Sequence, residues 1–158
     1  MTDKPKARRL GAAAAIATAI AIPAEGLRQF AYYDPPGILT VCYGTTTNVI
    51  AHKKYSIDEC KRLLDADMQA AVAAVDRCAP GLPVNALAAF ADATYNLGPK
   101  IACDTKASTA ARLLASGHIA AACEQLPRWN KASVGGVMIP LPGLTRRREA
   151  ERQLCLTP

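Results

Sequence analysis

The clearest hydrophobic pattern lies in the segment YSIDECKRLLDADMQAAVAAVDRC, residues 55–78. Ser56 with Glu59 three residues later forms a capping box, the signature of a helix start. Pro80-Gly81 then stops the pattern. The apolar side chains in between recur at helical spacing, at Ile57, Cys60, Leu64, Met68, Ala71, Val72 and Val75. We therefore predict one long helix that ends before Pro80.

Shorter patterns of the same kind predict further helices. They cover residues 84–97, 108–116, 119–126 and 144–154. The β-branched and glycine-rich run over 38–50 predicts a small hairpin or two short strands. The glycine- and proline-rich segment SVGGVMIPLPG, residues 133–143, predicts a loop.

This order of elements predicts a mostly helical α+β fold. An N-terminal lobe with a small β-hairpin is joined by the long helix to a helical C-terminal lobe. A cleft between two such lobes is a common place for a ligand site.

The N-terminus differs in composition from the rest. Residues 4–9, KPKARR, are basic, and residues 10–24, LGAAAAIATAIAIPA, carry no charge. This is the pattern of an export signal. As a helix the uncharged segment would span about 22 Å, against about 30 Å for the hydrocarbon core of a bilayer, so it would hold in a membrane only weakly.

Three interpretations of this segment compete. It is a cleaved signal peptide with a site at Ala19-Ile20-Ala21, an uncleaved weak anchor, or a buried alanine-rich helix. Cleavage after Ala21 would leave Glu25 almost at the new terminus. We therefore favour the uncleaved anchor, and divide the chain into a basic and anchoring segment at 1–24 and a catalytic domain at 25–158.

The charge and the cysteine content restrict the kind of partner that the protein binds and the cellular compartment in which it acts. The net charge of +6 suggests an anionic partner, such as nucleic acid, an anionic membrane or bacterial cell wall. Nucleic acid is disfavoured because no basic stripe is interleaved with stacking aromatic residues. Six cysteines without a CxxC pair, and two histidines that stand apart from them, disfavour a metal site and favour disulfides in an oxidising compartment. We expect no cofactor and a monomer.

Candidate chemistry begins at Glu25. Asp34 follows nine residues later and Thr40 six residues after that. Two carboxyl groups and a hydroxyl around a gap suit a glycosidase, in which one acid protonates the leaving oxygen and the other activates water. Each residue also has an ordinary role: Glu25 as a first-turn helix acid, Asp34 as a turn residue before Pro35, and Thr40 as a strand residue. The residues alone favour these ordinary roles.

A family resemblance changes this balance. The pattern Glu25-Gly26, Ala31-Tyr32-x-Asp34, Gly37, Thr40 and Tyr43-Gly44 resembles the phage-type lysozymes, or endolysins. The spacing of Glu, Asp and Thr is identical to that of the family's catalytic triad. The later segments FADATYNLG, CDTKASTAARLLASG, RWNKASVGG and GLTRRREAERQLCL are similar to further family signatures.

The resemblance implies a lysozyme-like fold and a catalytic role for three residues. Glu25 would be the general acid, Asp34 would orient or activate the water, and Thr40 would help to place it. It also implies inversion at the anomeric carbon. The altered loops at 103–109 and 133–142 lie where the far wall of the cleft should be, so they affect subsite preference.

The implied activity is that of a peptidoglycan muramidase, which lyses the host cell for phage release. The alanine-rich N-terminus resembles the signal-anchor-release branch, in which residues 10–24 would tether the exported enzyme to the inner membrane before its release into the periplasm. A lytic transglycosylase is an alternative enzyme, and a non-catalytic wall-binding module is an alternative of another class.

Two supporting features complete the expectations. Arg146 or Arg147 is expected to pair with Glu25, although a solvated basic helix face is as plausible. Tyr32, Tyr43 and Trp129 either face sugar rings or pack in the core. Among fifteen connectivities we propose neighbour pairing of the cysteines, as Cys42–Cys60, Cys78–Cys103 and Cys123–Cys155.

Overall fold

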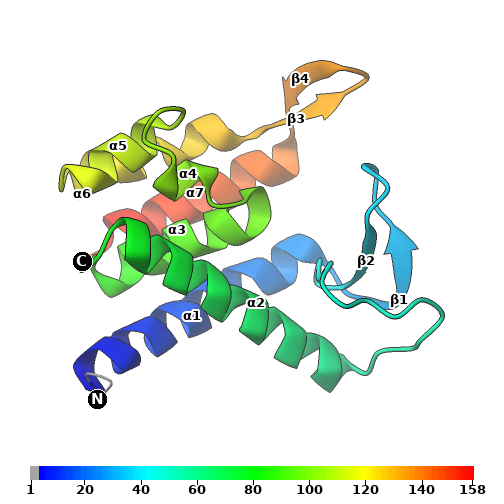
Figure 1. The fold of residues 1–158 in the computed structure, drawn as a ribbon. Helices are drawn as coiled ribbons and strands as arrows, with labels where there is room; N and C mark the ends of the chain where they lie inside the picture. Colours follow the sequence, from blue (N-terminus) through cyan, green and yellow to red (C-terminus); the bar gives the residue numbers. More distant parts are fainter. Residues whose placement is uncertain (1–3) are drawn as a thin grey trace.

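Helices carry most of the chain in the computed structural model, which describes residues 4–158 (Figure 1). The helices are α1 (Lys4–Glu25), α2 (Ile57–Cys78), α3 (Val84–Leu97), α4 (Lys100–Cys103), α5 (Thr109–Ala115), α6 (Ile119–Cys123) and α7 (Pro142–Leu156). The strands form two separate antiparallel hairpins, β1 (Arg28–Tyr33) with β2 (Leu39–Cys42), and β3 (Lys131–Val134) with β4 (Val137–Pro140). The predicted α+β, mostly α class is confirmed.

The predicted long helix is α2. Ser56 accepts a hydrogen bond from the Glu59 backbone N–H at 3.0 Å, and the Glu59 carboxylate accepts one from the Ser56 N–H at 2.7 Å, so the capping box is complete. Helix α3 has the predicted limits and is buried along most of its length, which makes it the centre of the core. Helices α1, α2 and α7 all pack against it.

Helix α1 contains the whole uncharged N-terminal segment and continues to Glu25. Its buried residues are Ala13, Ala14, Ala17 and Ala21, which form one stripe and lie in the same core as α2 and α3. Alanine has little side-chain volume, so the helix axes can approach closely along this stripe. By length and composition alone α1 could also cross a membrane. The predicted domain boundary between residues 24 and 25 falls in the last turn of α1.

The basic end of α1 is fixed by one carboxylate of α2. Arg9 donates to Asp76 at 2.5 Å and to the Leu82 carbonyl at 2.7 Å, and Lys6 lies 3.2 Å from the same carboxylate. Asp76 is 6% exposed. Burial alone would raise the pKa of Asp76, but the hydrogen bonds from Arg9 and Lys6 outweigh it and hold this pKa below its usual value.

The first hairpin lies earlier in the chain than predicted. β2 falls within the expected range 38–50, but its partner is β1, the aromatic stretch RQFAYY, rather than a second strand from that range. Glu25 is also not a first-turn helix acid, because it is the last residue of α1. This long helix is followed almost at once by β1, because Gly26 adopts a φ of 70° and ends α1.

The segment 133–143 is not a loop, and this prediction was wrong. β3 and β4 pair in regular register, with Lys131 opposite Pro140 and Val134 opposite Val137. Gly135 and Gly136 form the turn with φ values of 58° and 82°. A two-residue turn with both φ values positive matches the twist of a hairpin, so the two glycines specify a hairpin here.

Smaller differences lie in the C-terminal lobe. The helix predicted over 119–126 ends at Cys123 and is followed by a separate 3-10 turn over Leu126–Trp129, with Pro127 at its start. The one-turn helix α4 gives no periodic signal because it is only four residues long. Ser108 caps α5, and α7 extends the predicted basic helix by two residues at each end.

All six cysteines form disulfides, in the neighbour pairing proposed from the sequence. Cys42–Cys60 joins β2 to α2, Cys78–Cys103 joins α2 to α4, and Cys123–Cys155 joins α6 to α7. The first bridge connects the N-terminal hairpin to the long helix. The other two hold short elements of the C-terminal lobe to longer ones.

The Asp76 contacts predict a role for the basic end of α1 in stability. Arg9→Gln should lower the free energy of unfolding by about 1.5–3 kcal/mol at pH 7, because it removes charge-assisted hydrogen bonds from a buried carboxylate. Urea unfolding of the oxidised, purified protein measures this. Arg8→Gln is the matched control, because Arg8 is exposed and makes no ion pair within residues 4–158.

The effect should also depend on pH in a defined direction. The pKa of Asp76 is lowered in the folded state, so its stabilisation is complete above its unfolded pKa of about 3.9 and is lost as pH falls through the lower folded value. The free energies of unfolding of Arg9→Gln and Arg8→Gln should therefore become equal as the pH falls into the acid range. An equal loss for Arg8→Gln at pH 7 would contradict this assignment.

Candidate active site

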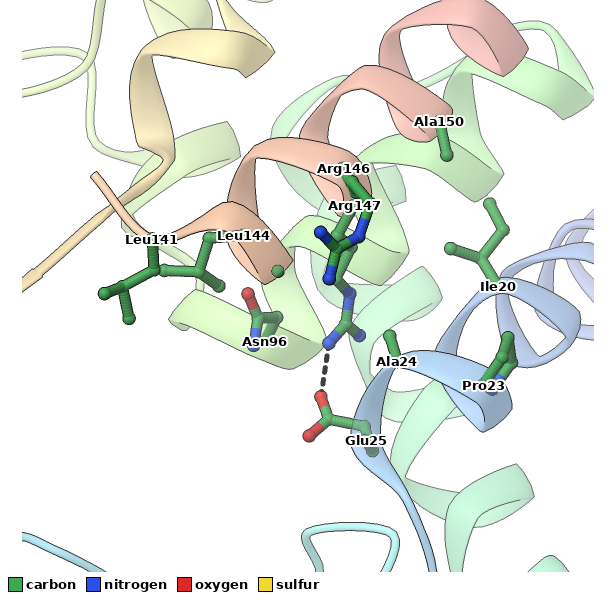
Figure 2. A pocket seen from close by; sticks show the side chains of 11 residues that line it. Ile20, Pro23, Ala24, Glu25, Asn96, Leu141, Leu144, Arg146, Arg147 and Ala150 are labelled. Carbon is green, nitrogen blue, oxygen red and sulfur yellow. Dashed lines mark hydrogen bonds and ion pairs between the residues drawn. The ribbon is translucent and has the colours of Figure 1, made fainter.

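Glu25 is the last residue of α1 and points out of the helix end toward α7 (Figure 2). Its side chain is 22% exposed. Nη1 of Arg147 donates to Glu25 Oε1 at 2.5 Å. The other carboxylate oxygen, Oε2, accepts no hydrogen bond from residues 4–158, so one oxygen of Glu25 is fixed and the other is available.

Asp34 and Thr40 lie together on the first hairpin. Thr40 faces Tyr32 in the register, and its hydroxyl lies 3.0 Å from the Ile38 carbonyl and 3.5 Å from Asp34 Oδ2. Asp34 Oδ1 accepts from the Ile38 backbone N–H at 2.8 Å. Asp34 thus does organise a turn, as its ordinary role requires, but one of its oxygens also faces a buried threonine hydroxyl. No hydrogen bond joins Asp34 to Glu25 within the described residues.

Gly44 lets the chain after β2 approach the acid closely. Its φ is 100°, and a Cβ there would lie 3.3 Å from the Tyr95 hydroxyl oxygen and 3.6 Å from Glu25 Oε2. Tyr95 donates a hydrogen bond to the carbonyl of Tyr43. Burial raises the pKa of Tyr95 well above its usual value, and the nearby Glu25 charge adds to this, so the phenol stays protonated and keeps donating.

Arg147 is the residue that connects Glu25 to the core. Its side chain is 4% exposed, and it donates to Asp92 on α3 through Nε at 2.9 Å and through Nη2 at 2.8 Å. Burial alone would lower the pKa of Arg147, but Asp92 and Glu25 outweigh it and raise this pKa. The planar guanidinium therefore has two donors on Asp92 and a third on Glu25, which fixes the position of the acid.

A second buried ion pair lies within α7, beginning at the residue that follows Arg147. Arg148 donates to Glu151 at 2.5 Å, and both side chains are fully buried. Burial and the neighbouring Asp92 carboxylate raise the pKa of Glu151 above its usual value, whereas burial lowers the pKa of Arg148. Two of the three consecutive arginines of α7 are thus directed inward.

The sequence left the choice between two arginines open, and the structure brings only Arg147 to Glu25. Arg146 is exposed and makes no ion pair within residues 4–158. Asp92 was not among the predicted site residues, although the sequence carried one signal: it is the single charged residue in the otherwise apolar or neutral segment 84–97. Tyr95 was missed because its role depends on contacts between distant segments.

The aromatic and histidine residues have more ordinary positions. Tyr43 is 6% exposed and belongs to the core, and Trp129 packs partly against it. Tyr32 is half-buried, with the Arg28 guanidinium 4.4 Å from the centre of its ring. His52 and His118 are exposed. Within residues 4–158 no group of three or more His, Cys, Asp and Glu gathers that could hold a metal ion.

A cavity of about 610 Å³ opens beside Glu25. Figure 2 shows Asn96 on one side of the Glu25–Arg147 contact, with Pro23 and Ala24 on the other. Residues of α1, α3 and α7 line it together with the chain that follows β4. The acid with its available oxygen thus lines a cavity of ligand size.

Comparison with known proteins identifies the relatives of this site. Residues 23–151 match the phage lysozyme family, a range that includes Glu25, Asp34, Thr40 and Arg147. The chain belongs to the phage lysozyme family. It is 36% identical over 149 residues to the SAR-endolysin of Pseudomonas phage phiKMV, which covers 94% of this chain and 91% of the relative.

Solved structures of the phage lysozyme fold are also similar. The muramidase domain of SpmX from Asticaccaulis excentricus has a TM-score of 0.79 at 27% identity, over 90% of this chain and 95% of that one. The active form of the P1 phage endolysin Lyz has a TM-score of 0.74 at 25% identity, over 89% and 83%. The predicted lysozyme-like fold and the resemblance to the signal-anchor-release endolysins are confirmed. This phage lysozyme is a peptidoglycan-degrading lysis enzyme.

The geometry of Arg147 predicts that its shape matters as much as its charge. Arg147→Lys keeps the charge but cannot reach Asp92 with two donors and Glu25 with a third. We expect kcat on peptidoglycan to fall by roughly tenfold to a hundredfold with little change in KM, because Glu25 is misplaced rather than removed. Turbidity assays with purified cell walls measure both.

A control separates this effect from a general loss of arginine. Arg62→Lys, at an exposed position of α2, should leave kcat unchanged. Full kcat in Arg147→Lys, in a protein shown by circular dichroism to be folded, would mean that the guanidinium does not position Glu25.

Proposed function

We propose that this phage lysozyme is a muramidase, which hydrolyses the β-1,4 bond between N-acetylmuramic acid and N-acetylglucosamine in peptidoglycan. The observation that supports this best is the arrangement at Glu25: one oxygen bound by Arg147, the other free and facing Gly44, beside a cavity. The net charge of +6 also suits an acidic wall.

The proposed chemistry assigns one task to each residue. Glu25 donates a proton through Oε2 to the glycosidic oxygen as the bond from that oxygen to the anomeric carbon breaks. A water molecule attacks the anomeric carbon from the opposite face and gives its proton to Asp34, and Thr40 helps to place this water. The products are two shorter glycan strands, one with a new reducing end and inverted configuration. No cofactor enters the reaction.

Two alternatives make different products. A lytic transglycosylase needs the acid but no water-activating carboxylate, and it leaves anhydro ends. The contact between the Thr40 hydroxyl and Asp34 supports hydrolysis, because these residues have no task in a reaction without water. A non-catalytic wall-binding module would need none of the three residues.

The products of digestion distinguish these functions. Mass spectrometry of sugars released from purified peptidoglycan should show reducing-end N-acetylmuramic acid for the wild type. Glu25→Gln should reduce this release by about 10²–10⁴-fold, because the general acid is lost. Glu124→Gln, which removes an exposed acid that pairs with Arg152, should leave it unchanged.

Each other result has a defined meaning. Anhydro ends would favour a transglycosylase and remove the roles assigned to Asp34 and Thr40. Equal release of sugars by the wild type and by Glu25→Gln would contradict the assignment of Glu25 as the general acid.

We also infer that the protein is exported with α1 uncleaved, tethered by residues 10–24 to the inner membrane, and then released into the host periplasm. The support is the packing of α1: cleavage after Ala21 would remove the buried alanine stripe and the Arg9 contact with Asp76. While these residues lie in a bilayer they cannot also pack against α3. The tethered form therefore lacks the Glu25–Arg147 contact and is inactive.

Intact-mass measurement of the protein recovered from the periplasm tests the export proposal. We expect the apolar segment 10–24 to be present in full, because it forms part of the core. A mass that lacks the first 21 residues would contradict the proposal. Membrane-held protein that cleaves glycan as fast as released protein would contradict the inactivity of the tethered form.

A further inference from the structure

One short turn connects the two parts of the site. Asp34 and Thr40 lie on the first hairpin, and no hydrogen bond among residues 4–158 joins either of them to Glu25. The connection is made by the turn at residues 41–45, which begins directly after Thr40 and includes Gly44 beside Glu25 Oε2. The position of the hairpin relative to the acid therefore depends on the conformation of this turn.

The 41–45 turn is closed by its own backbone around a left-handed residue. Val41 and Thr45 exchange two hydrogen bonds of 2.9 Å between their N–H groups and carbonyls, and the Gly44 N–H donates to the Val41 carbonyl at 3.2 Å. Inside this closure Cys42 has a φ of 62°. A residue with a side chain adopts this conformation only at a cost in free energy, so the position favours glycine. Since the sequence has a cysteine here, a contact outside the turn must hold the conformation.

Helix α2 holds the turn at two points. Cys42 forms a disulfide with Cys60, in the first turn of α2, and both residues are buried. Thr45 donates through its hydroxyl to Asp67 Oδ2 at 2.8 Å. Asp67 lies about two helical turns after Cys60, so both attachment points share one face of α2. Of the two attachments, the disulfide is the one that acts on the left-handed residue itself.

We propose that the Cys42–Cys60 disulfide is a positioning element of the active site. It holds Cys42 in the left-handed conformation and thereby fixes Thr40 relative to Glu25. This inference rests on the proposed function, because it takes Glu25 and Thr40 as groups that act on the substrate and the water. Without the bridge, an L residue at position 42 relaxes toward negative φ, the hydrogen bonds that close the turn weaken, and Thr40 moves away from its position.

A second disulfide on the same helix provides a matched control. Cys78–Cys103 joins the last residue of α2 to α4. The sequence separation of its cysteines is 25, against 18 for the first bridge, so the two bridges should contribute similarly to the free energy of unfolding. The control bridge lies outside the 41–45 turn and outside the lining of the cavity beside Glu25. Removing either bridge should lower stability, but only removal of the first should misplace the reacting groups.

Kinetics on purified cell walls, at a temperature where every variant is folded, separate these two roles. Cys42→Ala with Cys60→Ala should lower kcat by about tenfold to a hundredfold with little change in KM, because the reacting groups are misplaced. Cys78→Ala with Cys103→Ala should leave kcat unchanged. Cys42→Gly with Cys60→Ala also lacks the bridge, but it should recover most of the lost kcat, because glycine adopts a φ of 62° readily.

Hydrogen exchange makes the test independent of catalysis. The Gly44 and Thr45 amides, which donate to the Val41 carbonyl, should exchange about tenfold faster in Cys42→Ala with Cys60→Ala than in the wild type. Removal of the control bridge should leave their exchange rates unchanged.

Four results would each overturn the proposal. They are an unchanged kcat without the Cys42–Cys60 bridge, an equal loss of kcat without the control bridge, no recovery with Cys42→Gly, and unchanged exchange of the turn amides. Absence of reducing-end N-acetylmuramic acid with the wild-type protein would instead overturn the proposed function, and the exchange rates would still decide what holds the turn.

Discussion

The structure depends on one buried cation. Arg147 lies where α1, α3 and α7 meet, and its guanidinium donates to a fully buried carboxylate on α3 and to the exposed end of α1. A charge removed from water needs complete pairing, and removing one partner of such a pair leaves the other uncompensated at large cost. The position of the proposed catalytic acid is therefore tied to the packing of the core.

As the membrane tether proposed above, helix α1 has to satisfy two physical demands. Its alanines make it apolar enough to engage a membrane weakly, and small enough to pack closely against the core through Ala13, Ala14, Ala17 and Ala21. Longer apolar side chains would strengthen the first interaction and obstruct the second. The basic residues before this segment follow the same logic, because Arg9 and Lys6 fit an export signal and also neutralise Asp76.

The parts of the site differ in how they are held. Asp34 and Thr40 are six residues apart on one hairpin, so local turn geometry is enough to bring them together. Glu25 and Arg147 are 122 residues apart and meet only when the N- and C-terminal helices pack together. Formation of the site is thus limited by the long-range contact, which is also the one that a membrane-embedded α1 would prevent.

The sequence by itself determined the elements whose signals are local. Periodicity and the Ser56–Glu59 box defined α2, flanking Pro and Gly defined α3, and the spacing of Glu25, Asp34 and Thr40 identified the family. The sequence did not predict the β3–β4 hairpin, because the glycine- and proline-rich segment around its two turn glycines is typical of a loop.

Only the tertiary structure decided between Arg146 and Arg147, and only it revealed that Asp92 binds Arg147 and that Tyr95 donates to the Tyr43 carbonyl. Adjacent residues of a helix point about 100° apart. Which of them enters the core is therefore set by the surface that the helix meets, and that surface is built from distant parts of the chain.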